Sequence, residues 1–172
     1  MEQASGKLEE SKKKHHNKIQ NLFKDDAAAW DAFKSGNESA FICIGNSTGG
    51  TISYFASAVE ERIKLAVVSC SFSTYESSWL KYPHCSCGYL PGVLEVGDMP
   101  DFAQLIAPRD LIIVAGVNGH LADIEGVRRG YEIAKEAYAE GDNLANLKLI
   151  EGDGGHQFYP DLAWPEINKR KE

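Results

Sequence analysis

Four short runs of consecutive apolar residues organise the chain. They lie at residues 39–44, 63–69, 109–115 and 147–150. Continuous rather than alternating apolar runs of this length are typical of strands buried on both faces, as in a parallel sheet. Between and after these runs, apolar residues recur at helical spacing at 51–61, 123–140 and 160–169, and 101–106 resembles one helical turn. The alternation predicts an α/β fold in three layers, with a short parallel sheet of about four strands and helices on both faces.

The N-terminal segment differs from the rest in charge. Residues 1–25 are predicted to form a charged arm or helix, with helical spacing at 8–24, and residues 26–172 a single domain that starts with a short helix at 27–34. The net charge of the chain is −7, but residues 1–24 hold six lysines against three glutamates and carry +3, so the remainder carries −10. An acidic domain argues against nucleic acid as the main partner.

The composition of the chain indicates its cellular compartment and whether it binds a metal or cofactor. No apolar run approaches the ~20 residues of a membrane span, and the charged N-terminus does not resemble a secretory signal. Four cysteines without framework spacing indicate a reducing, cytoplasmic location. Cys85 and Cys87 lie beside His84, as metal ligands could, but no second ligand pair stands at zinc-like spacing. We therefore expect no metal and no cofactor.

The first apolar run leads directly into a candidate nucleophile. Residues Gly45-Asn46-Ser47-Thr48-Gly49 match the pattern G-x-S-x-G, and a helical pattern follows. Strand, sharp turn and helix form the context in which this motif is a nucleophile elbow, with the N–H of the residue after the serine facing an oxyanion. A plain strand-to-helix turn remains the alternative, because small-residue turns are common.

Three loops that follow strand ends carry the residue types of serine hydrolysis. Ser47, the loop 116–122 with Asp123, and His156 each follow the end of a predicted strand, where sites of parallel sheets lie. Their order along the chain, serine then acid then histidine, is that of α/β hydrolases. Among the five histidines, His156 alone has the position of the base.

Four motifs together carry a resemblance to a known family. They are 45–51, Leu105-Ile106-Ala107-Pro108-Arg109, Val114-Ala115-Gly116 and 154–159. Over about residues 26–168 the chain resembles the α/β hydrolases, in particular the dienelactone hydrolase-like and acetyl xylan esterase-like members. This resemblance implies Ser47 as nucleophile, His156 as base and the Thr48 N–H as an oxyanion donor.

The chain departs from the family pattern in two ways. The usual acid position is occupied by Gly119; Asp123 is the nearest carboxylate, as acid or only as a helix N-cap, and Glu125 is a weaker substitute. About forty residues precede Ser47, too few for the strands that the family has there, so the resemblance covers only the C-terminal half of the fold. The run 40–44 would then be an apolar sheet edge without charge or proline, and we expect a homodimer through it.

These observations predict a serine carboxylesterase for small, acetyl-type esters. The irregular segment 70–99 would line the acyl or sugar pocket with Tyr75, Trp79, Tyr82 and Tyr89, although such aromatic residues can equally pack as a lid. The alternative function is a truncated or degenerate hydrolase half without catalysis, acting as a binding or assembly module.

Overall fold

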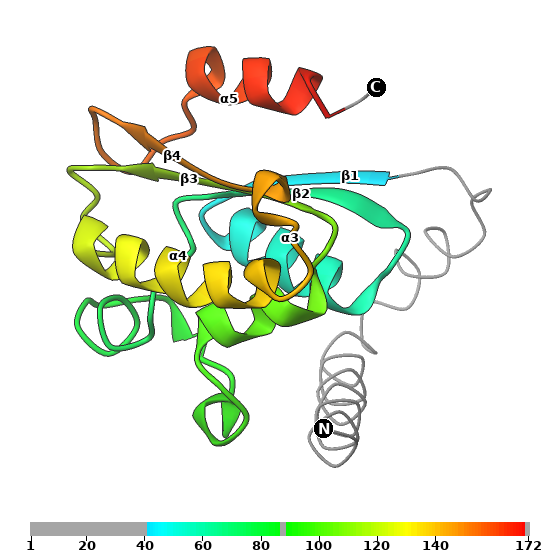
Figure 1. The fold of residues 1–172 in the computed structure, drawn as a ribbon. Coiled ribbons are helices and arrows are strands. Elements are labelled where there is room, and N and C mark those ends of the chain that lie inside the picture. The colour runs from blue at the N-terminus through cyan, green and yellow to red at the C-terminus, as the bar shows by residue number, and fades with distance from the viewer. Residues whose placement is uncertain (1–40, 87–88, 171–172) are drawn as a thin grey trace, which may run out of the picture.

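The predicted sheet is present in the structure, a computed structural model that describes residues 41–86 and 89–170 (Figure 1). Four strands form one fully parallel sheet in the order β1-β2-β3-β4: β1 (Phe41–Asn46), β2 (Ile63–Ser69), β3 (Asp110–Gly116) and β4 (Leu147–Gly152). Their ends differ from the predicted ones by two residues at most. The helices predicted at 8–24 and 27–34, and the first two residues of the strand predicted at 39–44, lie outside the described residues.

The helices lie on both faces of the sheet, as predicted (Figure 1). The elements are α3 (Thr48–Val59), η4 (Met99–Leu105), α4 (Ile124–Ala139) and α5 (Pro160–Asn168), with single turns at η3 (Val93–Glu95) and η5 (Leu144–Asn146). Right-handed crossovers between strands that follow chain order place α3, η4 and α4 on one face, and α5 covers the other. Helix α3 begins three residues earlier than predicted, because Gly49 and Gly50 are accommodated in its first turn.

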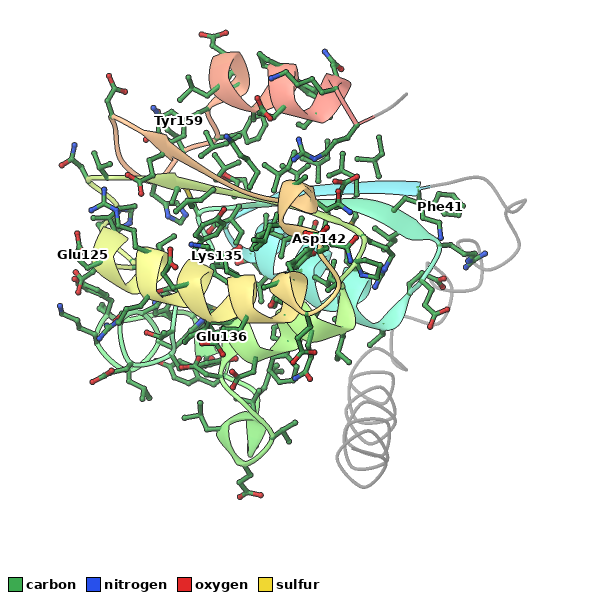
Figure 2. All side chains as sticks on the ribbon, viewed as in Figure 1. Phe41, Glu125, Lys135, Glu136, Asp142 and Tyr159 are labelled. Carbon is green, nitrogen blue, oxygen red and sulfur yellow. The ribbon has the colours of Figure 1, made fainter. Side chains whose placement is uncertain are left out.

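All four strands point the same way, so their carboxyl ends share one edge of the sheet. Figure 2 shows Phe41 at the amino end of β1 and Tyr159, which follows β4, near the opposite edge. Ser47, Cys70, Val117 and Asp153 directly follow the four strands at this carboxyl edge.

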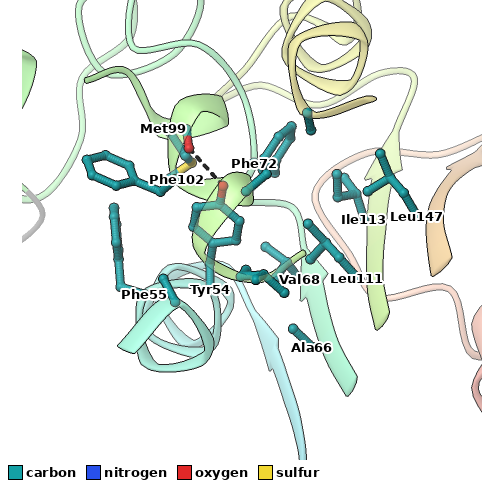
Figure 3. Packing of buried hydrophobic residues seen from close by; sticks show 14 of the residues in the cluster. Tyr54, Phe55, Ala66, Val68, Phe72, Met99, Phe102, Leu111, Ile113 and Leu147 are labelled. Carbon is teal, nitrogen blue, oxygen red and sulfur yellow. Dashed lines mark hydrogen bonds between the residues drawn. The ribbon is translucent and has the colours of Figure 1, made fainter. Parts of the chain in front are cut away.

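Two hydrophobic cores lie on the two faces of the sheet. The larger one packs β2 and β3 against α3, η4 and α4, with Tyr54 at its centre (Figure 3). Tyr54 is fully buried, donates its hydroxyl to the Met99 carbonyl oxygen at 2.8 Å, and meets the rings of Phe55 and Phe72 edge to face at 5.5 Å. The smaller core packs Leu65, Val67, Ile112, Val114 and Ile150 against α5. Strands buried on both faces explain why the apolar runs are continuous.

Arg109 holds the amino side of the sheet together. Its guanidinium donates to the carbonyl oxygens of Ser57 and Leu105 at 2.8 and 2.7 Å, and to those of Glu60 and Ile63 at 2.9 and 2.8 Å. The end of α3, the start of β2 and the end of η4 therefore converge on one side chain. These four hydrogen bonds lie at the amino side of the sheet, whereas the candidate site lies at its carboxyl edge.

No helix within residues 41–86 and 89–170 has the length and apolar character that crossing a bilayer requires.

Candidate active site

Ser47 sits in a strained turn between β1 and α3. Its backbone angles are φ 58° and ψ −125°, outside the regions that L residues ordinarily occupy, and it is the N-cap of α3. Two backbone hydrogen bonds fix the turn: the Ser47 N–H donates to the Ser69 carbonyl oxygen at 2.8 Å, and the Thr51 N–H donates to the Ser47 carbonyl oxygen at 3.1 Å. Strain of this kind persists only where the surroundings over-determine it, and it clusters at functional sites.

Two of the three glycines around Ser47 are needed because backbone or side-chain atoms approach them closely. A Cβ at Gly45 would lie 2.0 Å from the Gly49 carbonyl oxygen, and one at Gly50 would lie 2.3 Å from the Ser71 Oγ. A Cβ at Gly49 would meet nothing within 4 Å. The sequence G-N-S-T-G-G therefore contains two sterically required glycines, and these let β1, α3 and the end of β2 pack closely around the Ser47 turn.

The loop that carries His156 is bound tightly to the loop after β3. The N–H groups of Val117 and Asn118 donate to the carbonyl oxygens of Gly152 and Gly154, both at 2.9 Å, and the Asn118 amide donates to the Asp153 carbonyl oxygen at 3.0 Å. The two loops approach so closely that a Cβ at Gly116 would lie 2.0 Å from the Gly155 carbonyl oxygen. The position of His156 is thus fixed by backbone contacts.

Cys70 links the histidine loop to the serine side of the sheet. Its thiol donates to the Gln157 carbonyl oxygen at 3.2 Å, so the loop after β4 reaches across β3 to the end of β2. Cys70 has φ 53°, and it follows Ser69, whose backbone binds Ser47. Contacts therefore run without interruption from Ser47 through Ser69 and Cys70 to the neighbour of His156. No role at the candidate site was predicted for Cys70.

His156 is surrounded by histidines rather than by carboxylates. Its ring meets that of His120 edge to face, with 5.2 Å between the centroids. Burial lowers the pKa of His156 below its usual value, and the positive charges of His120 and then His84 lower it further. Within the described residues, neither the Ser47 hydroxyl nor the His156 ring makes a hydrogen bond. A lowered pKa keeps the imidazole neutral near pH 7, the state that a general base requires.

Asp123 contacts the irregular segment instead of His156. It is the N-cap residue of α4, but its carboxylate makes no capping hydrogen bond. One carboxylate oxygen binds the Lys81 ammonium group and the other accepts the Tyr82 hydroxyl. Lys81 and then Tyr82 lower the pKa of the carboxyl group. The carboxylate therefore holds residues 81 and 82 against the start of α4, and its role as a catalytic acid stays a prediction.

The other carboxylate candidates are placed elsewhere. Glu125 forms an ion pair with Arg128 at 2.6 Å, and the same arginine binds both oxygens of Glu151, at 2.8 and 2.6 Å. Gly119 has no side chain, but a Cβ there would lie 3.3 Å from the Gly116 carbonyl oxygen and 3.4 Å from that of Ala122. A small side chain at position 119 therefore needs only a slight adjustment of the loop.

Thr48 is the first residue of α3, so its N–H lies among those that lack an intrahelical acceptor. This position suits an oxyanion donor next to Ser47. Within the described residues, no group of three or more histidines, cysteines or carboxylates is arranged to hold a metal ion.

Three of the four aromatic residues predicted to line a pocket contact one another within the segment, and the fourth, Tyr82, contacts Asp123. Trp79 stacks on His84 at 4.1 Å between centroids and lies 6.2 Å from Tyr75 and 5.5 Å from Tyr89. Tyr75 is buried, and this burial together with Asp98 raises its pKa to about 12. Tyr82 is bound to Asp123. These four residues therefore contact protein groups, and their contact with substrate stays a prediction.

A groove of about 520 Å³ lies away from this site. It is bordered by η4 and the C-terminal part of α4, including Pro100, Ala107, Ile133, Glu136 and Asn143. Figure 2 shows Glu136 far along α4 from Glu125, toward the amino side of the sheet. The groove and the Ser47–His156 edge are therefore separate features.

The fold is shared with solved esterase structures at low sequence identity. A Bacteroides fragilis protein, provisionally assigned as an acetyl xylan esterase, superposes with a TM-score of 0.67 at 16% identity over 86% of this chain and 47% of its own. The glucuronoyl esterase from Solibacter usitatus gives 0.61 at 15% identity, over 84% of this chain and 46% of its own. A glucuronoyl esterase from Teredinibacter turnerae gives 0.56 at 18% identity, over 73% and 38%.

These similarities define the class of fold. The chain has an α/β-hydrolase-like fold and spans under half the length of each of these structures. No protein-family model matches the sequence, and no curated protein matches it significantly.

Proposed function

We propose that the chain is a serine esterase that cleaves small carboxylic esters of the acetyl type. The observation that carries this proposal is the strained backbone of Ser47 at the β1–α3 junction. A plain turn has no need of φ 58° at a serine, whereas a nucleophile elbow uses it to present the hydroxyl. The contact from Cys70 to the His156 loop and the esterases among the similar folds support the same conclusion.

The proposed reaction proceeds through an acyl-enzyme. The Ser47 hydroxyl oxygen attacks the ester carbonyl carbon while His156 takes the hydroxyl proton, and the Thr48 N–H donates to the developing oxyanion. His156 then gives the proton to the departing alcohol. Water, activated by the same imidazole, attacks the acyl group and releases the acid. The tyrosines and Trp79 of the irregular segment would border the acyl or sugar side.

The proposed enzyme is slow. The Asp123 carboxylate is bound by Lys81 and Tyr82 rather than by His156. Loss of the acid that orients the imidazole can lower turnover by ~10⁴. Detection of the nucleophile should therefore rely on covalent labelling first and on turnover second.

A fluorophosphonate probe tests the nucleophile directly. We expect labelling of the wild type and none of Ser47→Ala or His156→Ala, with p-nitrophenyl acetate turnover following the same order. Ser71→Ala is a matched control, because the Ser71 Oγ lies close to the elbow but is buried without a hydrogen-bond partner. Labelling that survives Ser47→Ala contradicts the proposal.

The second candidate is a non-catalytic binding or assembly module of this fold. The engagement of Asp123 by Lys81 and Tyr82 favours it. A folded wild type that neither labels nor turns over ester would support this alternative. A reducing, cytoplasmic location remains part of either proposal.

A further inference from the structure

We propose that His120 is the positioning residue of the base: its imidazole takes the place beside His156 that a carboxylate holds in a Ser-His-acid site. This inference rests on the proposed esterase function. His120 would accept a hydrogen bond from one ring N–H of His156, which leaves the other ring nitrogen free to take the Ser47 proton. The proton abstracted from Ser47 stays on His156 until it passes to the leaving alcohol.

The first support is the location of His120. It directly follows Gly119 in the loop after β3, and this loop is bound to the His156 loop through Val117 and Asn118. The two rings meet edge to face with centroids 5.2 Å apart, a separation at which a ring N–H of one can be turned toward a ring nitrogen of the other. The pair is therefore brought together by backbone contacts before any substrate binds.

The second support is what surrounds His156 on each side. His120 lies on the loop after β3, and His84 on the irregular segment contributes a weaker charge. His84 is itself held by the Ser78 hydroxyl at 3.2 Å and the Leu121 carbonyl oxygen at 3.1 Å. Asp123 is bound by Lys81 and Tyr82, and Glu125 and Glu151 are bound by Arg128. Neither these carboxylates nor Asp153, which lies on the His156 loop, is among the groups that shift the pKa of His156. The lowered pKa of His156 is consistent with these surroundings, since an ionised carboxylate beside it would act in the opposite direction.

A histidine in this place has a kinetic signature that a carboxylate lacks. The site is competent only when both imidazoles are neutral, so log kcat/KM should rise with a slope approaching two on the acidic limb of the pH profile. With a carboxylate or an amide in place of His120, only His156 titrates and the slope becomes one. A purely structural role of His120 would lower activity without changing this slope.

Three variants of the full chain test the inference: His120→Asn, His120→Asp and the control His84→Gln. We expect His120→Asn to change the slope from two to one. His120→Asp should raise kcat/KM about tenfold, a part of the ~10⁴ that orientation of the imidazole is worth. His84→Gln should keep the slope of two. A slope of one in the wild type, or a slope of two that persists in His120→Asn, overturns the inference.

A measurement that does not depend on turnover separates this inference from the proposed function. In the Ser47→Ala background, NMR titration of the His156 ring should show a shifted midpoint when His120 is replaced by Asn, because His156 then no longer titrates as part of a coupled pair of imidazoles. An unchanged midpoint means that the two rings are not coupled and overturns the inference, even if Ser47 labels. Failure of the probe to label wild-type Ser47, with the midpoint shift present, overturns the esterase function instead.

Discussion

The two outer strands of the sheet carry the two halves of the proposed site, but they are protected differently. Within the described residues, β1 pairs only with β2, and β4 pairs only with β3. On β4, Lys148 is exposed, Glu151 is held by Arg128, and Leu147 and Ile150 are buried under α4 and α5. On β1, no residue is charged, and Ile42 and Ile44 are 40% and 41% exposed.

The difference follows from the reach of α5. Ile42 and Ile44 lie in register with Leu65 and Val67, which are buried beneath α5, so α5 covers β2 but leaves β1 open on the same face. Charged residues discourage pairing at a sheet edge, and β4 has them. Among the described residues, the β4 edge is therefore protected by charged residues, whereas the β1 edge is apolar and is not covered by α5. We propose that a second copy pairs with β1 antiparallel across a two-fold axis, which would give one sheet of eight strands.

The largest expected effect concerns the elbow at the end of β1. Gly45→Ala should unfold or severely destabilise the chain and abolish labelling, because the new Cβ would lie 2.0 Å from the Gly49 carbonyl oxygen. Overpacking typically costs about 1–3 kcal/mol and occasionally more, and a contact with backbone at this distance belongs to the upper end. Thermal unfolding followed by circular dichroism measures it. The matched control is Gly49→Ala, which meets nothing within 4 Å and should keep or raise the Tm.

The next effect concerns assembly and compares the two edges directly. Ile44→Lys on β1 should shift the proposed dimer to a monomer, because a charge on an apolar edge opposes strand pairing. Lys148→Gln on β4 should leave the assembly unchanged. Sedimentation or light scattering at micromolar concentration distinguishes the two. A wild type that is already monomeric under these conditions contradicts pairing through β1.

A smaller effect is expected at the acid position on the histidine side. Gly119→Asp should raise kcat/KM for p-nitrophenyl acetate about tenfold, since it adds an orienting carboxylate at a position where a Cβ requires only a slight adjustment of the loop. Gly119→Asn is the matched variant, with the same size and no charge. Equal rates in the two variants would show that position 119 cannot serve the base in this chain.

The smallest effect is expected for Asp123. Asp123→Asn removes an ion pair in which the Lys81 and Asp123 side chains are 52% and 35% exposed, so the Tm should fall only slightly. Esterase activity should fall less than tenfold, far less than in His156→Ala. A loss as large as that of His156→Ala would show that Asp123 is the acid after all, released from Lys81 and Tyr82 during turnover.

Local pattern was sufficient to predict the sheet. Strands β1 to β4 are recognisable because burial on both faces demands continuous apolar residues, and their shared carboxyl edge follows from parallel order. The start of α3 was missed because Gly49 and Gly50 have low helix propensity, whereas close approach to the end of β2 is what places Gly50 there.

The contacts of the predicted site residues could not be predicted from local sequence patterns. The partners of Asp123, Lys81 and Tyr82, lie about forty positions away in a segment without periodicity. The meeting of His120 and His156 depends on how two loops bind each other through backbone groups. The available signal for His120 was its place next to Gly119, in the loop where the acid was expected.

The strand order has a consequence for how the domain folds. Because β1, β2, β3 and β4 are neighbours in the order of the chain, each strand can add to the edge left by the one before it, and no strand must be inserted between two that are already paired. The connection between β2 and β3 is the longest and the least regular, and the entropy lost on closing a loop grows with its length. Docking of β3 onto β2 should therefore limit the folding rate. Arg109, directly before β3, then stabilises the docked strand through hydrogen bonds to four carbonyl oxygens.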